Sequence, residues 1–155
     1  MKVVCAIGQR EGGELVQRMV ELLGVRHECL LVRVIDPGPR HELAEFLRGP
    51  LHRPPHPGPE RREASLGAAE RKAGLSAVEE AQTAAQRAGL AATTITKEGQ
   101  PEKVILETAR EFGAGLIVLR AREGADGRPR IGPASVGHTA RFVIDHAECS
   151  VLILR

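Results

Sequence analysis

The apolar run Gly115-Leu116-Ile117-Val118-Leu119, the loop after it and the sequence Gly137-His138-Thr139 decide how this chain is expected to fold. A short apolar run is typical of a buried strand in a parallel sheet. The loop is rich in Gly and Arg, so its backbone can approach a ligand closely. At the start of the next helix the first amide N–H groups lack intrahelical partners, and the helix dipole adds positive charge. The stretch therefore predicts a phosphate site.

Around this stretch the chain alternates between strand-like and helix-like patterns. Apolar or β-branched runs predict strands over 2–7, 28–35, 91–96, 116–119 and 150–154, and helical spacing predicts helices over 15–23, 60–88, 101–112 and 137–145. Gly74 is a candidate break in the long helix, and the weakly hydrophobic third strand is a candidate sheet edge. Such strand–helix–strand units pair in parallel. The pattern predicts an α/β, three-layer doubly wound sandwich with five mostly parallel strands.

A Pro-rich insertion separates the second strand from the long helix. Seven prolines fall within 37–59, so regular structure there is mostly excluded, apart from a short helix over 41–48. We expect a surface excursion inside one domain of residues 1–155.

Composition argues against two classes of partner. The net charge is only +2, and Phe, the only aromatic type, supplies 2% of the residues, so stacking on nucleic-acid bases is not expected. No segment approaches the roughly 18 apolar residues of a membrane helix, and the first apolar run is too short for a signal peptide. Cys5, Cys29 and Cys149 each lie in an apolar run, which favours buried reduced thiols and a cytoplasmic protein.

The order of these elements resembles the universal stress protein family, whose domain is Rossmann-like and similar to the adenine-nucleotide alpha-hydrolase fold. The matching segments are the first strand with its Gly-containing turn, Val32-Arg33-Val34-Ile35-Asp36-Pro37, Gly99-Gln100-Pro101, Gly113-Ala114-Gly115-Leu116-Ile117-Val118 and His146-Ala147-Glu148-Cys149-Ser150-Val151-Leu152-Ile153. The resemblance covers nearly the whole chain. It implies the strand order 3-2-1-4-5, a role in stress response and binding of ATP, with or without Mg²⁺.

The Gly-rich loop matches the family's ATP-binding pattern in part. ATP-binding members carry G-x2-G-x9-G followed by Ser or Thr. Gly124, Gly127 and Gly137 satisfy the glycines, but His138 stands at the Ser or Thr position and Thr139 follows it. The four residues from Arg120 to Glu123 precede the first glycine, and Gly8 stands where the family commonly has an Asp.

The expected site combines loop chemistry with the resemblance. Arginines at 120, 122, 128 and 130 could hold phosphates through bidentate contacts, and the resemblance implies that Ala6 and Val34 flank the adenine. The predicted nucleotide-binding residues are Ala6, Gly8, Val34, Leu119, Arg120, Gly124, Gly127, Gly137, His138 and Thr139. The alternative is a family member with a degenerate site, which acts as a dimeric interaction protein.

Neither a catalytic centre nor a metal site is predicted. Asp36 and Asp126 are the only carboxylates near the loop that could serve phosphoryl transfer, and both have an explanation as turn residues, so at most slow ATP hydrolysis is expected. His41, His52 and His56 lie in the Pro-rich insertion without the spacing of a structural zinc site. His146 is expected to end the last helix, and His27 to lie on the surface.

The last strand bears on self-association. Val151, Leu152, Ile153 and Leu154 form an apolar C-terminal strand, which at a sheet edge would expose unpaired backbone groups. The resemblance implies a homodimer through this strand. The alternative is that the Pro-rich excursion covers the edge.

Overall fold

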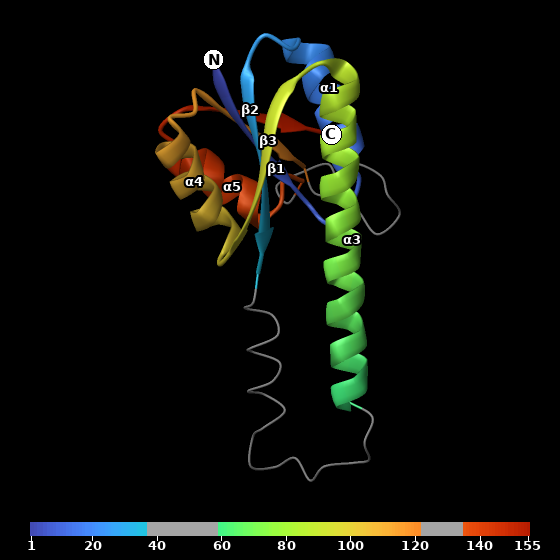
Figure 1. The fold of residues 1–155 in the computed structure, drawn as a ribbon. Helices are drawn as coiled ribbons and strands as arrows, with labels where there is room; N and C mark the ends of the chain where they lie inside the picture. The colour runs from blue at the N-terminus through green and yellow to red at the C-terminus, as the bar shows by residue number, and fades with distance from the viewer. Residues whose placement is uncertain (37–58, 122–134) are drawn as a thin grey trace.

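The structure, a computed structural model, describes residues 1–36, 59–121 and 135–155, and of residues 59–70 it describes the backbone alone. Its elements, shown in Figure 1, are β1 (Lys2–Ile7), α1 (Gly12–Leu23), β2 (Glu28–Ile35), α3 (Pro59–Ala88), β3 (Ala91–Glu98), α4 (Pro101–Phe112), β4 (Leu116–Arg120), α5 (His138–His146) and β5 (Ser150–Leu154). The expected helix over 41–48 lies outside the described residues.

The five strands form one sheet in the order β3-β2-β1-β4-β5, and every neighbouring pair is parallel. The predicted fold class and strand order are confirmed. β1 is central and pairs with β2 through Lys2↔Glu28 and with β4 through Val3↔Leu116. β3 and β5 are the two edges, so the expectation of an edge position for the third strand is confirmed.

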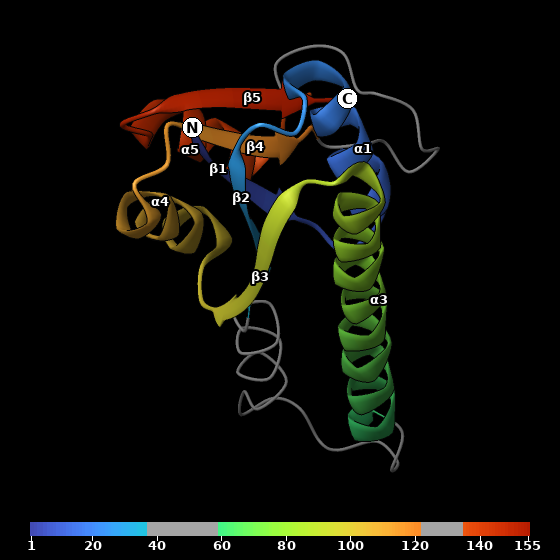
Figure 2. The same ribbon diagram turned by 45° about the horizontal axis from the view of Figure 1, so that its top comes forward.

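Two helices cover each face of the sheet, as Figures 1 and 2 show. On one face, α1 and α3 pack on alternate strand residues in a cluster that includes Met19, Leu31 and Val118. On the other, α4 and α5 pack on the remaining residues in a cluster that includes Ile117 and Val143. The two clusters explain why the strands read as continuous apolar runs, because both faces of the sheet are buried.

The long helix α3 runs unbroken for 30 residues, so the predicted break near Gly74 is wrong. Its N-terminal half projects past the carboxyl ends of the strands (Figure 1). A Cβ atom at Gly74 would lie 1.4 Å from Nη1 of Arg33 in β2, so this glycine leaves room for the guanidinium. The buried Arg33 side chain is 7% exposed.

α1 begins at Gly12, three residues before the predicted start at Leu15. A Cβ atom at Gly12 would lie 2.0 Å from the carbonyl oxygen of Ala77, so the backbones of α1 and α3 meet there. The helix ends at Leu23, and Gly24 follows as the predicted C-terminal cap, with a positive φ of 72° that favours glycine.

His27 is buried, so the expectation of a surface position is wrong. It lies between α1 and β2, and its Nε2 atom has no hydrogen-bond partner in the described structure. Burial lowers the pKa of His27, and the positive charge of the Met1 amino group adds to this effect.

The cysteines are free, with Cys5 and Cys29 buried and Cys149 half-buried. Burial raises the pKa of the Cys29 thiol to about 12. Among the described residues no helix combines the length and the apolar character that crossing a bilayer requires.

Candidate functional site

The sheet changes its winding direction between β1 and β4. β1 leads through α1 to β2 on one side, and β4 leads through α5 to β5 on the other. α1 and α5 cover opposite faces, so their starts diverge at the carboxyl ends of these two strands. In open α/β sheets, ligands bind in the crevice at this point. We call this place the β1–β4 crevice.

Three predicted residues lie together on the face covered by α4 and α5. Ala6 of β1, Val34 of β2 and Leu119 of β4 belong to the same apolar cluster. Leu119 is buried, whereas Ala6 and Val34 are partly accessible near the carboxyl ends of their strands. They provide apolar surface beside the crevice, the kind of surface on which a planar base packs.

The start of α5 supplies the polar end of the same face. Gly137 precedes the helix with a φ of 82°, and no side chain caps the first turn. No acidic residue lies in this turn, in contrast to Glu14 in α1 and Glu102 in α4. The first amides and the positive end of the dipole are therefore suited to an anion.

His138 and Thr139 open this helix. The His138 side chain is 80% exposed, and its Nε2 lies 3.9 Å from Oε1 of Glu102 at the start of α4. A protonated imidazole would join the starts of α4 and α5. Thr139 is half-buried.

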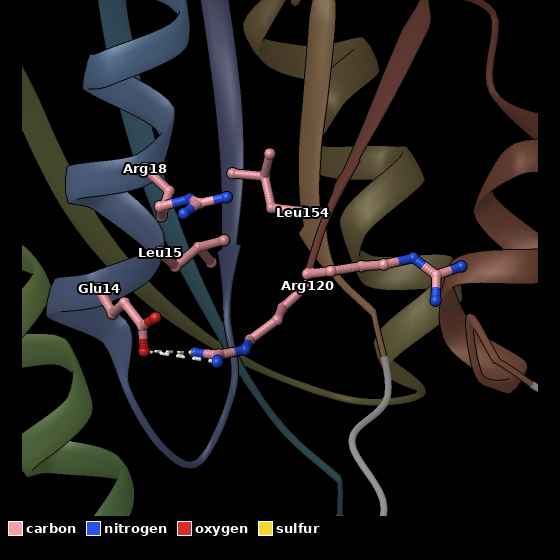
Figure 3. A pocket seen from close by; sticks show the side chains of 6 residues that line it. Glu14, Leu15, Arg18, Arg120 and Leu154 are labelled. Carbon is pink, nitrogen blue, oxygen red and sulfur yellow. Dashed lines mark hydrogen bonds and ion pairs between the residues drawn. The ribbon is translucent and has the colours of Figure 1, made fainter. Parts of the chain in front are cut away.

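Arg120 lies on the opposite face from the apolar residues. It follows Leu119 in β4, so strand alternation directs it toward α1. Its Nη1 atom forms an ion pair with Oε2 of Glu11, and its Nη2 lies 3.4 Å from Oε2 of Glu14. Figure 3 shows the contact with Glu14. We call this arrangement of Arg120, Glu11 and Glu14 the Arg120 bridge.

A small pocket adjoins the bridge, between α1 and the ends of β4 and β5 (Figure 3). Its lining is mostly charged and consists of Glu14, Leu15, Arg18, Arg120, Leu154 and Arg155. The Nη2 atom of Arg155 donates a hydrogen bond of 3.3 Å to Oγ of Ser135, which is buried just before α5. The ends of neighbouring strands thus carry arginines that contact α1 and the approach to α5.

Glu11 has an unusual backbone conformation. It precedes α1 with φ 55° and ψ 37°, and it is the one described non-glycine residue with a positive φ. The left-handed region is unfavourable for a residue with this side chain, and such strain clusters at functional sites. The acidic partners of Arg120 were not predicted, because Glu14 precedes Arg120 by 106 residues and only the fold brings them together.

Gly8 lies exposed at the end of β1. A Cβ atom there would meet nothing within 4 Å, so packing does not exclude the carboxylate that the resemblance implies at this position. Gly124 and Gly127 lie outside the described residues, as do His41, His52, His56 and Asp126. In the described ranges, no group of three or more His, Cys, Asp or Glu side chains is placed to hold a metal ion.

Comparison with known sequences gives a family and relatives that match part of the chain. The model of the universal stress protein family matches residues 1–155. Universal stress protein E of Escherichia coli strain K12 is 40% identical over 62 residues, which cover 40% of this chain and 18% of that protein. The match thus spans less than a fifth of the relative's length.

Solved structures share the fold at low sequence identity. A universal stress protein from Archaeoglobus fulgidus aligns over 100% of this chain and 98% of its own, with a TM-score of 0.63 and 16% identity. One from Arabidopsis thaliana, solved with AMP bound, has a TM-score of 0.62 at 17% identity and covers 99% and 90%. A universal stress protein in complex with cAMP has a TM-score of 0.60 at 17% identity and covers 100% and 96%. Because the family model matches residues 1–155, the chain belongs to the universal stress protein family.

Proposed function

We propose that this protein binds an adenine nucleotide, ATP or a related adenylate, in the β1–β4 crevice and acts in stress response as a cytoplasmic homodimer. The observation that best supports this proposal is that an apolar face and an uncapped helix start meet at the carboxyl edge of the sheet. The apolar face is formed by Ala6, Val34 and Leu119, and the helix start is that of α5. The relatives with bound AMP and cAMP support an adenylate as the ligand.

In this proposal the base packs against the apolar residues and the phosphates reach the first amides of α5. Gly137 lets the backbone turn into the helix, and His138 is the first side chain that a phosphate would meet. Gly124 and Gly127 are proposed to complete the phosphate loop, and Mg²⁺ would offset the charge of a triphosphate. Gly8 leaves the base without the carboxylate that the family commonly supplies.

Calorimetric titration with ATP tests the proposal, with GTP as the control for the base. We expect ATP to bind and GTP to bind more weakly. His138→Ser restores the hydroxyl of the family pattern and Gly8→Asp the carboxylate, so each is expected to tighten ATP binding. His146→Ser, at the opposite end of α5, is the matched control and should change nothing. A double variant combines His138→Ser with Gly8→Asp. If neither the folded wild type nor this folded double variant gives a heat of binding at millimolar ATP, nucleotide binding is refuted.

The second candidate is a nucleotide-independent protein that acts through dimerisation. It is favoured by the Arg120 bridge, because two carboxylates already occupy the guanidinium expected to hold phosphate. β5 supplies the proposed dimer surface, since it is a sheet edge made of apolar residues, Val151 to Leu154. A second copy could pair with its free backbone groups.

A further inference from the structure

The Arg120 bridge crosses the β1–β4 crevice on its α1 side. Arg120 ends β4, and Glu11 and Glu14 belong to the start of α1, which follows β1. Because β1 and β4 are neighbours in the sheet, the ion pairs connect the end of β4 to the start of α1, the helix on one side of the crevice. A ligand tail that crosses the carboxyl edge toward α1 would meet this bridge.

The bridge uses much of the hydrogen-bonding capacity of Arg120. A guanidinium offers five N–H donors in a planar fork that suits carboxylate and phosphate alike. Arg120 is 22% exposed, whereas Glu11 and Glu14 are about half exposed, so the cation is partly withdrawn from water and the anions are not. A phosphate can take the place of the two carboxylates on Arg120, but only if it displaces these groups, whose charge has the same sign as its own.

The backbone of Glu11 suggests why the carboxylate lies there. Its left-handed conformation is disfavoured, yet it accepts the hydrogen bond from the Leu15 N–H at 3.1 Å that begins α1. The same turn presents the Glu11 side chain to Arg120. Asn tolerates this conformation better than Glu, so the charge can be removed without adding backbone strain.

We propose that Glu11 and Glu14 set the affinity and the charge preference of the nucleotide site, because they compete with the ligand's phosphates for Arg120. The proposal rests on the nucleotide binding proposed above. It makes these two glutamates specificity-determining residues that weaken the binding of adenylates in proportion to their negative charge. Adenosine binding should be insensitive to them, AMP binding slightly sensitive and ATP binding the most sensitive.

Titration of adenosine, AMP and ATP without divalent cations tests this charge dependence. The variants are Glu11→Asn, Glu14→Gln and the double variant. Glu21→Gln, on the same helix and at an exposed position where the side chain accepts a hydrogen bond from Gln17, is the control. We expect the double variant to bind ATP about fivefold more tightly, to gain less for AMP and nothing for adenosine. The gain should largely disappear in an Arg120→Gln background, and Mg²⁺ should reduce it.

The outcomes separate this inference from the proposed function. If the wild type binds ATP and the variants bind it equally well, the competition is refuted and nucleotide binding stands. If adenosine gains as much as ATP, the glutamates act on the base and the inference is also refuted. If none of the folded proteins binds any adenylate, nucleotide binding fails and takes the inference with it. Circular dichroism melting curves show whether each variant is folded.

Discussion

Arg33 is a charged side chain in the interior of an otherwise apolar layer. It extends from β2 toward α3, and its Nη1 atom has no hydrogen-bond partner in the described structure. Burial lowers the pKa of its guanidinium, because loss of water disfavours the charged form. A buried nitrogen of a cationic group that lacks a hydrogen-bond partner destabilises a fold. Gly74 accommodates this side chain sterically but does not neutralise it.

Replacing Arg33 should therefore stabilise the protein. Arg33→Met keeps the length of the side chain and removes the charge, so we expect the free energy of unfolding to rise by about 1 kcal/mol or more. Urea unfolding measures it. Arg26→Met, at an exposed position, is the control and should change little. A lower unfolding midpoint for Arg33→Met would show that the guanidinium contributes to stability.

His27 predicts a dependence of stability on pH. Because burial lowers its pKa in the folded state, the unfolded chain binds the proton more readily, with an ordinary pKa of about 6.5. The contribution of His27 to stability is complete above that pH and decreases as the pH falls below it. Urea unfolding at pH 7, 6 and 5 should show a smaller loss for His27→Leu than for the wild type. His146→Gln, at the exposed end of α5, should keep the wild-type slope.

Among the elements, the strands were predicted well, whereas the roles of Gly12 and Gly74 were not. The strands are apolar runs because both faces of the sheet are buried, so β1, β2 and β5 match their predicted ranges. Gly12 and Gly74 resemble breaks in the sequence, yet both lie within helices and make room for a packing partner. Sequence spacing does not reveal a partner that only the fold supplies.

The same reason limits what could be predicted of the site. The uncapped start of α5 and the apolar residues Ala6, Val34 and Leu119 follow from local pattern and resemblance. The orientation of Arg120 was accessible too, since Val118 and Arg120 share a face of β4. Its pairing with Glu11 was not, because it depends on how β1 and β4 lie side by side.

The contact between α1 and α3 predicts that adding a single methyl group at Gly12 lowers the stability of the fold. In Gly12→Ala the new Cβ would approach the carbonyl oxygen of Ala77, and helix backbone cannot move aside as a side chain can. We expect a loss of about 1–3 kcal/mol in stability despite the better helix propensity of Ala. Thermal unfolding measures it. Gly8→Ala, with open space around the Cβ, should unfold like the wild type.

The whole molecule has two unlike sheet edges. β3 carries polar residues, and its Lys97 is in an ion pair of 2.8 Å with Glu111 of α4. β5 carries only apolar residues after Ser150. Charge and polarity on an edge discourage strand addition, so the molecule is better suited to associate through β5 than through β3.

This difference between the two edges predicts which substitution dissociates the proposed homodimer into single chains. Ile153→Lys places a charge on β5 and should give the mass of one chain in light scattering at micromolar concentration, where the wild type gives twice that mass. Thr96→Lys, at an exposed position on the other edge, should leave the mass unchanged. A wild-type protein with the mass of one chain would remove the proposed interface.

The length of α3 has a consequence for access to the crevice. At 30 residues it measures about 45 Å, whereas the eight residues of β2 measure about 26 Å. The surplus extends beyond the carboxyl ends of the strands, on the side of the sheet that α1 and α3 cover (Figures 1 and 2). Because the crevice lies at those strand ends, we expect the projecting helix to hinder a folded partner that approaches from the α1 and α3 side more than it hinders a small nucleotide.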